Sequence, residues 1–182
     1  GGSSSTISHT VPGQTMQLTF SNTARQKVSL YVPSRAFANC VGMSIRYEER
    51  RTLVSCRCLT TCTCMEQFTL PATGTYTMPL NPVDVVTGNI TIALYDVPAD
   101  ATGTITIGGS NATISNTVPG QNMQLAFTGT AGQKVSLYVP SRAFANCVGM
   151  TILNPDQTTL VSFSCLNTDT FIEPFTLPAT GT

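Results

Sequence analysis

The sequence has few charged residues, one histidine, no tryptophan and no long apolar segment. Charged residues make up 10% of the 182, with nine Lys and Arg against nine Asp and Glu. Nucleic-acid binding requires a clustered excess of Lys and Arg, so this balance argues against it. No apolar run approaches the roughly 18 residues that a membrane span requires. Because 41% of the residues are hydrophobic, the chain can form a core, and we expect a folded protein with neither a nucleic-acid partner nor a membrane span.

What the sequence does contain is a long internal repeat. The 18 residues that begin at Gln26 recur without change from Gln133. At a constant offset of 107, residues 1–75 (copy 1) and 108–182 (copy 2) are identical at 53 of 75 positions. Self-similarity of this extent indicates two modules of one fold.

Alternating apolar and polar residues between Gly, Pro and Asn predict β-strands throughout. No stretch carries a 3.6-residue apolar period, although Ser34–Asn39 could form one short turn of helix. We therefore predict an all-β protein of two tandem antiparallel β-sandwich modules, jelly-roll or immunoglobulin-like, the second lacking its last strands. The strands expected in the first module are Ser5–His9, Met16–Phe20, Lys27–Val32, Val41–Tyr47, Thr52–Cys58, Cys64–Leu70, 75–80 and 88–95.

The repeat sets the expected domain boundaries. Residues 1–97 form the first module, 98–107 a connecting segment, and 108–182 a second, incomplete module, because nothing in copy 2 matches the strands expected at 75–80 and 88–95. The sequence leaves two alternatives open: an incomplete sandwich, or part of a longer tandem array.

The motifs also carry a family resemblance. The order VPGQ, MQLTF, QKVSLYV, TILNPDQTTLVS, FTLPATGTYTM and TGNITIALYDV resembles the bacterial pre-peptidase C-terminal family, especially its tandem versions in large secreted proteins. The resemblance covers copy 1 through Val97 and all of copy 2, and it implies secreted, non-catalytic β-sandwiches attached to enzymes or surface proteins. Copy 1 departs from the pattern at Arg46–Arg51, where RYEERR replaces the turn-like LNPDQT, and at CRCLTTCTC.

Four of the seven cysteines match between the copies. Cys40 aligns with Cys147 and Cys58 with Cys165. If residues 41–47 and 52–58 form a hairpin, the two cysteines of each copy lie close together. We therefore predict the disulfides Cys40–Cys58 and Cys147–Cys165, and with them an oxidising, secreted or cell-surface location.

The other three cysteines occur in copy 1 alone. Cys56 and Cys64 replace phenylalanines, and a Cys56–Cys64 bond across a hairpin is expected, leaving Cys62 as an intermolecular thiol. The alternative is a metal site, because Cys56, Cys58, Cys62 and Cys64 have the spacing C-x-C-x3-C-x-C. Zinc sites more commonly use C-x2-C spacing, and a site that used Cys58 would leave Cys40 unpaired, so we predict no metal.

Other motifs have simpler explanations. Asn89 and Asn111 fit the N-glycosylation sequon and are candidate glycosylation sites. The LPATG sequences that begin at Leu70 and Leu177 match the sortase pattern but are interpreted as turns. No Ser–His–Asp set can be assembled with His9, and the sequence contains no glycine-rich phosphate-binding loop. We therefore expect no catalytic residues, no cofactor and no enzyme activity.

Charge is unevenly distributed along the chain. Copy 1 has seven Lys and Arg against three acidic residues, residues 76–107 have three Asp and no basic residue, and copy 2 has two against three. Head-to-tail contact between such units is electrostatically favourable. The sequence thus predicts a secreted structural repeat protein that pairs with its own copies by strand complementation, in a fibre or surface stalk. The alternative is a carbohydrate-binding accessory module of a secreted hydrolase, with cell-surface glycans as partners.

Overall fold

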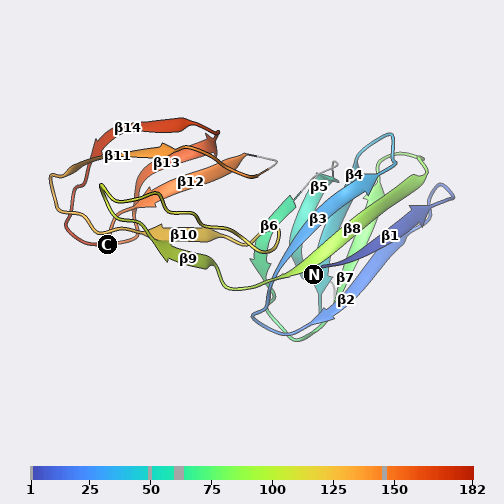
Figure 1. Cartoon of the computed structure of the whole chain (residues 1–182). Coiled ribbons are helices and arrows are strands. Elements are labelled where there is room, and N and C mark those ends of the chain that lie inside the picture. Colours follow the sequence, from blue (N-terminus) through green and yellow to red (C-terminus); the bar gives the residue numbers. More distant parts are fainter. Residues whose placement is uncertain (1, 49–50, 60–63, 145–146) are drawn as a thin grey trace. The chain divides into compact units, whose positions relative to one another are not determined.

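The computed structural model describes the whole chain except residues 1, 49–50, 60–63 and 145–146. The described chain is built from antiparallel strands, which confirms the predicted all-β fold class. It divides into two compact units (Figure 1). Unit 1 comprises Gly1–Ala101 and Ser115–Met123, and unit 2 comprises Thr102–Ile114 and Gln124–Thr182. The module boundaries expected from the repeat remain a prediction.

Unit 1 is formed by two four-stranded antiparallel sheets. Each strand expected in copy 1 is present, most of them a few residues longer than the alternation suggested. The strands are β1 (Ser3–His9), β2 (Met16–Asn22), β3 (Lys27–Arg35), β4 (Val41–Tyr47), β5 (Arg51–Leu59), β6 (Cys64–Thr69), β7 (Gly74–Pro82) and β8 (Gly88–Val97). One sheet has the order β1-β8-β3-β6 and the other β2-β7-β4-β5.

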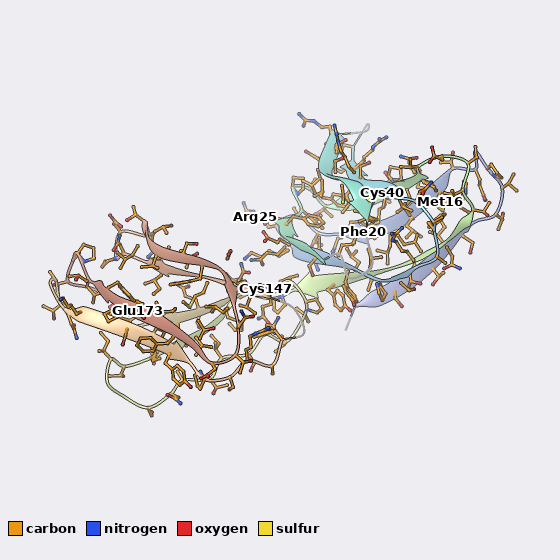
Figure 2. The ribbon with its side chains drawn as sticks, turned by 90° about the horizontal axis from the view of Figure 1, so that it is seen from above. Met16, Phe20, Arg25, Cys40, Cys147 and Glu173 are labelled. Atoms are coloured by element: carbon orange, nitrogen blue, oxygen red, sulfur yellow. A yellow bond between two sulfur atoms is a disulfide. The ribbon has the colours of Figure 1, made fainter. Side chains whose placement is uncertain are left out.

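The strands β7 and β8 each occupy an inner position of a sheet, and both supply the core. In β7 every second side chain from Tyr76 to Leu80 is buried, and in β8 Ile90 and Ile92 are buried. These side chains pack against buried residues of β2, β3 and β4. Figure 2 shows the side chains of this unit, including the core residue Met16 on β2. Two strands that are distant in sequence from β1 and β2 thus complete both sheets.

The one short helical turn that Ser34–Asn39 could form is not present. Strand β3 continues to Arg35, and the backbone N–H of Ala36 donates to the carbonyl of Asn89 at 2.8 Å. The Arg35 Nη1 then donates to the carbonyls of Phe37 and Asn39 at 3.2 and 2.8 Å. Sheet pairing and a guanidinium therefore satisfy the backbone groups that a helical turn would have paired.

The remaining strands form two-stranded sheets. They are β9 (Ala101–Thr104), β10 (Met123–Ala126), β11 (Lys134–Val139), β12 (Val148–Leu153), β13 (Thr159–Leu166) and β14 (Thr170–Thr176). In the described part of the chain they pair as β10-β9, β11-β14 and β12-β13. By sequence, β10 to β14 are the counterparts of β2 to β6, and no described strand of unit 2 corresponds to β7 or β8.

Candidate functional site

Two strands of unit 2 have an unpaired inner edge. In unit 1, β3 is paired with both β6 and β8, and β4 with both β5 and β7. Their counterparts have one partner each among the described residues, β14 for β11 and β13 for β12. An unpaired edge presents a row of backbone N–H and C=O groups to an incoming strand. These two edges, of β11 and β12, are the candidate functional site and are called the open edges below.

The open edges expose side chains that are buried in unit 1. Leu30 on β3 is 1% exposed, whereas the identical Leu137 on β11 is only half-buried. Met43 on β4 is 3% exposed, and its counterpart Met150 is likewise half-buried. The residues on both sides of Leu30 and Leu137 are identical, and those before Met43 and Met150 are identical as well, so we attribute the difference in burial to the strands beside them. The open edges therefore carry an apolar surface that a further pair of strands would cover.

The segment that corresponds to β1 shows the same dependence on a partner. β1 pairs along its whole length with β8, from Ser3 opposite Leu94 to His9 opposite Gly88. The equivalent residues 110–116 have a sequence similar to that of β1, but they form no strand. Because a strand is stabilised by its neighbours more than by its own propensity, this segment stays irregular without a counterpart of β8 beside it.

An exposed aromatic pair lies on the outer face of the β11-β14 sheet. Tyr138 and Phe171 are directly opposite in the strand register and are 51% and 55% exposed. The Tyr138 hydroxyl donates to the carboxylate of Asp169. That hydrogen bond, and the negative charge of Asp169, raise the pKa of Tyr138 above its ordinary value. Tyr138 lies within a strand pattern, where a tyrosine can equally belong to the core, so alternation alone does not indicate this exposed pair.

Both disulfides that the matched cysteines predict are present. Cys40 is bonded to Cys58 and Cys147 to Cys165, with Cα–Cα distances of 4.9 and 5.1 Å. The hairpins β4–β5 and β12–β13 bring each pair together, as expected. Figure 2 labels Cys40 in unit 1 and Cys147 in unit 2. In both copies a disulfide among the described residues thus ties the start of a hairpin to its end.

The cysteines found in copy 1 alone give a different result. Cys56 has a free thiol, 3.5 Å from the carbonyl oxygen of Cys58, so the predicted Cys56–Cys64 disulfide was wrong. The hairpin assumed for it does not form, because β5 belongs to the β2-β7-β4-β5 sheet and β6 to the other. Cys62 and the side chain of Cys64 lie outside the described residues, and the proposed intermolecular role of Cys62 stays a prediction.

The sole histidine has a structural setting. His9 is 3% exposed, with Nδ1 2.8 Å from the carbonyl oxygen of Val86 and Nε2 3.0 Å from that of Gln14. Both ring nitrogens therefore face backbone oxygens, and the ring joins the turn after β1 to the loop before β8. The candidate glycosylation residues Asn89 and Asn111 are both exposed.

Among the described residues, no group of three or more His, Cys, Asp or Glu side chains is placed to hold a metal ion. A shallow cavity of about 550 Å³ in unit 2 is lined by Thr, Gly, Ser, Asn, Ala and Ile residues between Thr102 and Ile114, and by Leu125. The cavity lining contains no titratable side chain, so it offers no group for acid–base chemistry.

No protein-family model matches the chain, and no curated protein matches it either. Within the described part of the chain, no helix has the length and apolar character that crossing a membrane requires.

Proposed function

We propose that this chain is a non-catalytic, secreted structural repeat protein whose copies assemble head to tail by strand complementation, in an extracellular fibre or surface stalk. The observation that carries the proposal is the pair of open edges on β11 and β12. The two disulfides are compatible with an oxidising, extracellular location. The resemblance of the motif order to pre-peptidase C-terminal repeats supports the same class.

The strands that fit the open edges can be described chemically. In unit 1, β7 and β8 pair with β4 and β3, and residues 26–43, which include β3 and the start of β4, recur unchanged in copy 2. A segment with the pattern of Gly74–Val97 therefore meets the same backbone and nearly the same side chains in unit 2. We infer that another copy of the repeat supplies such a segment by strand exchange, in which β7 and β8 leave their own unit 1 and add to the open sheet edges.

A synthetic peptide of residues 74–97, added to the whole chain, should bind unit 2 and slow hydrogen exchange at the amides of β11 and β12. The expected slowing is about tenfold or more at saturating peptide, because binding to the folded state opposes opening. The control peptide carries Leu80→Asp and Ile92→Asp, which place charges at two core positions. Equal protection by both peptides, or by neither, would contradict strand complementation.

Self-association is measured on the chain alone. Size-exclusion chromatography with multi-angle light scattering should give a mass that rises with protein concentration. A well-folded monomer of constant mass would contradict assembly. Non-reducing electrophoresis tests Cys62 separately: a reductant-sensitive dimer is expected in the original chain and should be lost in Cys62→Ala but kept in Cys56→Ala, the control for the free thiol of Cys56.

A second candidate function is favoured by the aromatic pair. Tyr138 and Phe171 form an exposed platform of the kind on which sugar rings stack, and Asp169 beside them accepts hydrogen bonds. If the chain is a carbohydrate-binding accessory module, it should bind members of a glycan array, and Phe171→Ala should reduce that affinity about tenfold or more. Phe175→Ala on the same strand is the matched control. Absence of glycan binding would leave the structural function alone.

A further inference from the structure

The motif Val-Pro-Gly-Gln forms the same turn twice. The N–H of Gln14 donates to the carbonyl of Val11 at 3.1 Å, and the N–H of Gln121 to that of Val118 at 3.2 Å. The glycines Gly13 and Gly120 have φ values of 82° and 85°. Pro at the second position and a left-handed Gly at the third are typical of a type II turn. The two turns therefore have the same backbone shape.

The second turn is docked on β3 of unit 1. Ser29 donates its hydroxyl to the carbonyl of Pro119 at 2.5 Å. A Cβ on Gly120 would lie 2.4 Å from the Cβ of Ser29, so only glycine permits this approach. Gln121 Nε2 donates to the carbonyl of Ala99 at 2.7 Å. The Val118–Gln121 turn thus sits directly on Ser29.

Docking explains the burial of Ser29. The neighbouring residues Val28 and Leu30 face the core and are 0% and 1% exposed, so alternation along the strand turns Ser29 outward. Ser29 is nevertheless 2% exposed, because the turn covers it. Its counterpart Ser136 on β11 is exposed, and so is Tyr138 two residues further along the same outer face. The surface around Ser136 is therefore exposed, whereas the equivalent surface around Ser29 is covered by the Val118–Gln121 turn.

The first turn is exposed in the same way. Val11 is 62% exposed, the other three residues of the turn are exposed as well, and a Cβ on Gly13 would meet no atom within 4 Å. The described structure thus has one uncovered turn, Val11–Gln14, and one uncovered serine surface around Ser136. Their counterparts, the Val118–Gln121 turn and Ser29, are in contact with each other in unit 1.

We propose that the Val11–Gln14 turn of one chain docks on Ser136 of β11 in a second copy. The Pro12 carbonyl accepts from the Ser136 hydroxyl, and Gly13 lies against Ser136, in the manner of Pro119 and Gly120 on Ser29. The contact is between different surfaces of the two copies, so it repeats from chain to chain without closing. It rests on the proposed function and names the surfaces by which copies meet.

The contact between chains is expected to be weaker than the one within unit 1. Ala99, which accepts from Gln121, lies outside the repeated segments, so copy 2 has no described counterpart for it. Tethering within one chain also gives an effective concentration in the millimolar range for short linkers. Association between separate chains should therefore be measured by sedimentation up to about 1 mM protein, which matches the effective concentration that the tether provides within one chain.

The test uses two variants of the full chain that block opposite sides of the contact. Gly13→Ala removes the close approach of the turn, and Ser136→Phe covers the acceptor surface. Each variant alone should lose association by tenfold or more relative to the original chain. An equimolar mixture should form dimers and nothing larger, because Ser136→Phe keeps its turn and Gly13→Ala keeps its acceptor.

Matched controls separate docking from general damage. Gly132→Ala changes another glycine at φ 82° with nothing near its Cβ, and Ser162→Phe adds the same ring on an exposed position of β13. Both should associate like the original chain. Association that persists in Gly13→Ala and Ser136→Phe would overturn docking and leave strand complementation standing. Dimers in the mixture with no binding of the 74–97 peptide would support docking and contradict strand complementation.

Discussion

Leu30→Ala is expected to lower the free energy of unfolding of unit 1 by about 2–5 kcal/mol, the range for truncating a fully buried leucine. The same change at Leu137 should lower that of unit 2 by clearly less, about 2 kcal/mol or below. Leu30 is 1% exposed and its strand has neighbours on both sides, whereas Leu137 is half-buried beside an open edge. The space left by truncating Leu137 is open to water, so no enclosed cavity forms and the loss of stability is smaller.

Hydrogen exchange read separately over β3 and β11 provides the measurement, because one melting curve would merge two units. The sequence around the two leucines is the same, which makes each position the control for the other. Adding the 74–97 peptide should raise the effect of Leu137→Ala towards that of Leu30→Ala. Equal effects without peptide would show that β11 is already covered, against the open edge.

Replacing both Cys147 and Cys165 by Ala should destabilise unit 2 by about 3 kcal/mol, because the bond closes a loop with a sequence separation of 18. The equivalent change at Cys40 and Cys58 removes a loop of the same length from unit 1. The consequence should differ, since most of the buried hydrophobic side chains lie in unit 1. Unit 2 is expected to unfold and unit 1 to stay folded.

Far-ultraviolet circular dichroism, combined with exchange resolved by unit, distinguishes these results. Cys56→Ala is the matched control, because Cys56 is a free thiol and its removal breaks no cross-link. If unit 2 keeps its exchange protection without its disulfide, then its own packing is sufficient and the open edges are less destabilising than their exposed side chains suggest.

Local pattern was enough to predict the strands of copy 1 and the two matched disulfides. Alternation identifies strands, and the hairpin β4–β5 brings Cys40 and Cys58 together because neighbouring strands in sequence commonly pair. The order of the strands within each sheet could not be predicted from local pattern. The pairing of β1 with β8 joins residues 79 to 91 positions apart, from His9 with Gly88 to Ser3 with Leu94, and nothing in the alternation of either strand specifies the other.

The errors have the same origin. Cys56 and Cys64 were placed on one hairpin, but the chain crosses between sheets after β5, so adjacency in sequence did not become adjacency in a sheet. The contact between Gly120 and Ser29 was also missed. The repeated Val-Pro-Gly-Gln motif indicated a turn, and only the three-dimensional arrangement shows that one of the two turns rests on a serine.

The disulfides also bear on how such a chain would respond to tension. Each bond joins residues 18 positions apart, so pulling on the ends of the protein cannot extend the chain between them. At about 3.3–3.6 Å per extended residue, roughly 60 Å of length stays locked in each copy. Force would travel through the S–S bridge and bypass the hairpin, and an unfolded copy would remain shorter than its residue count implies.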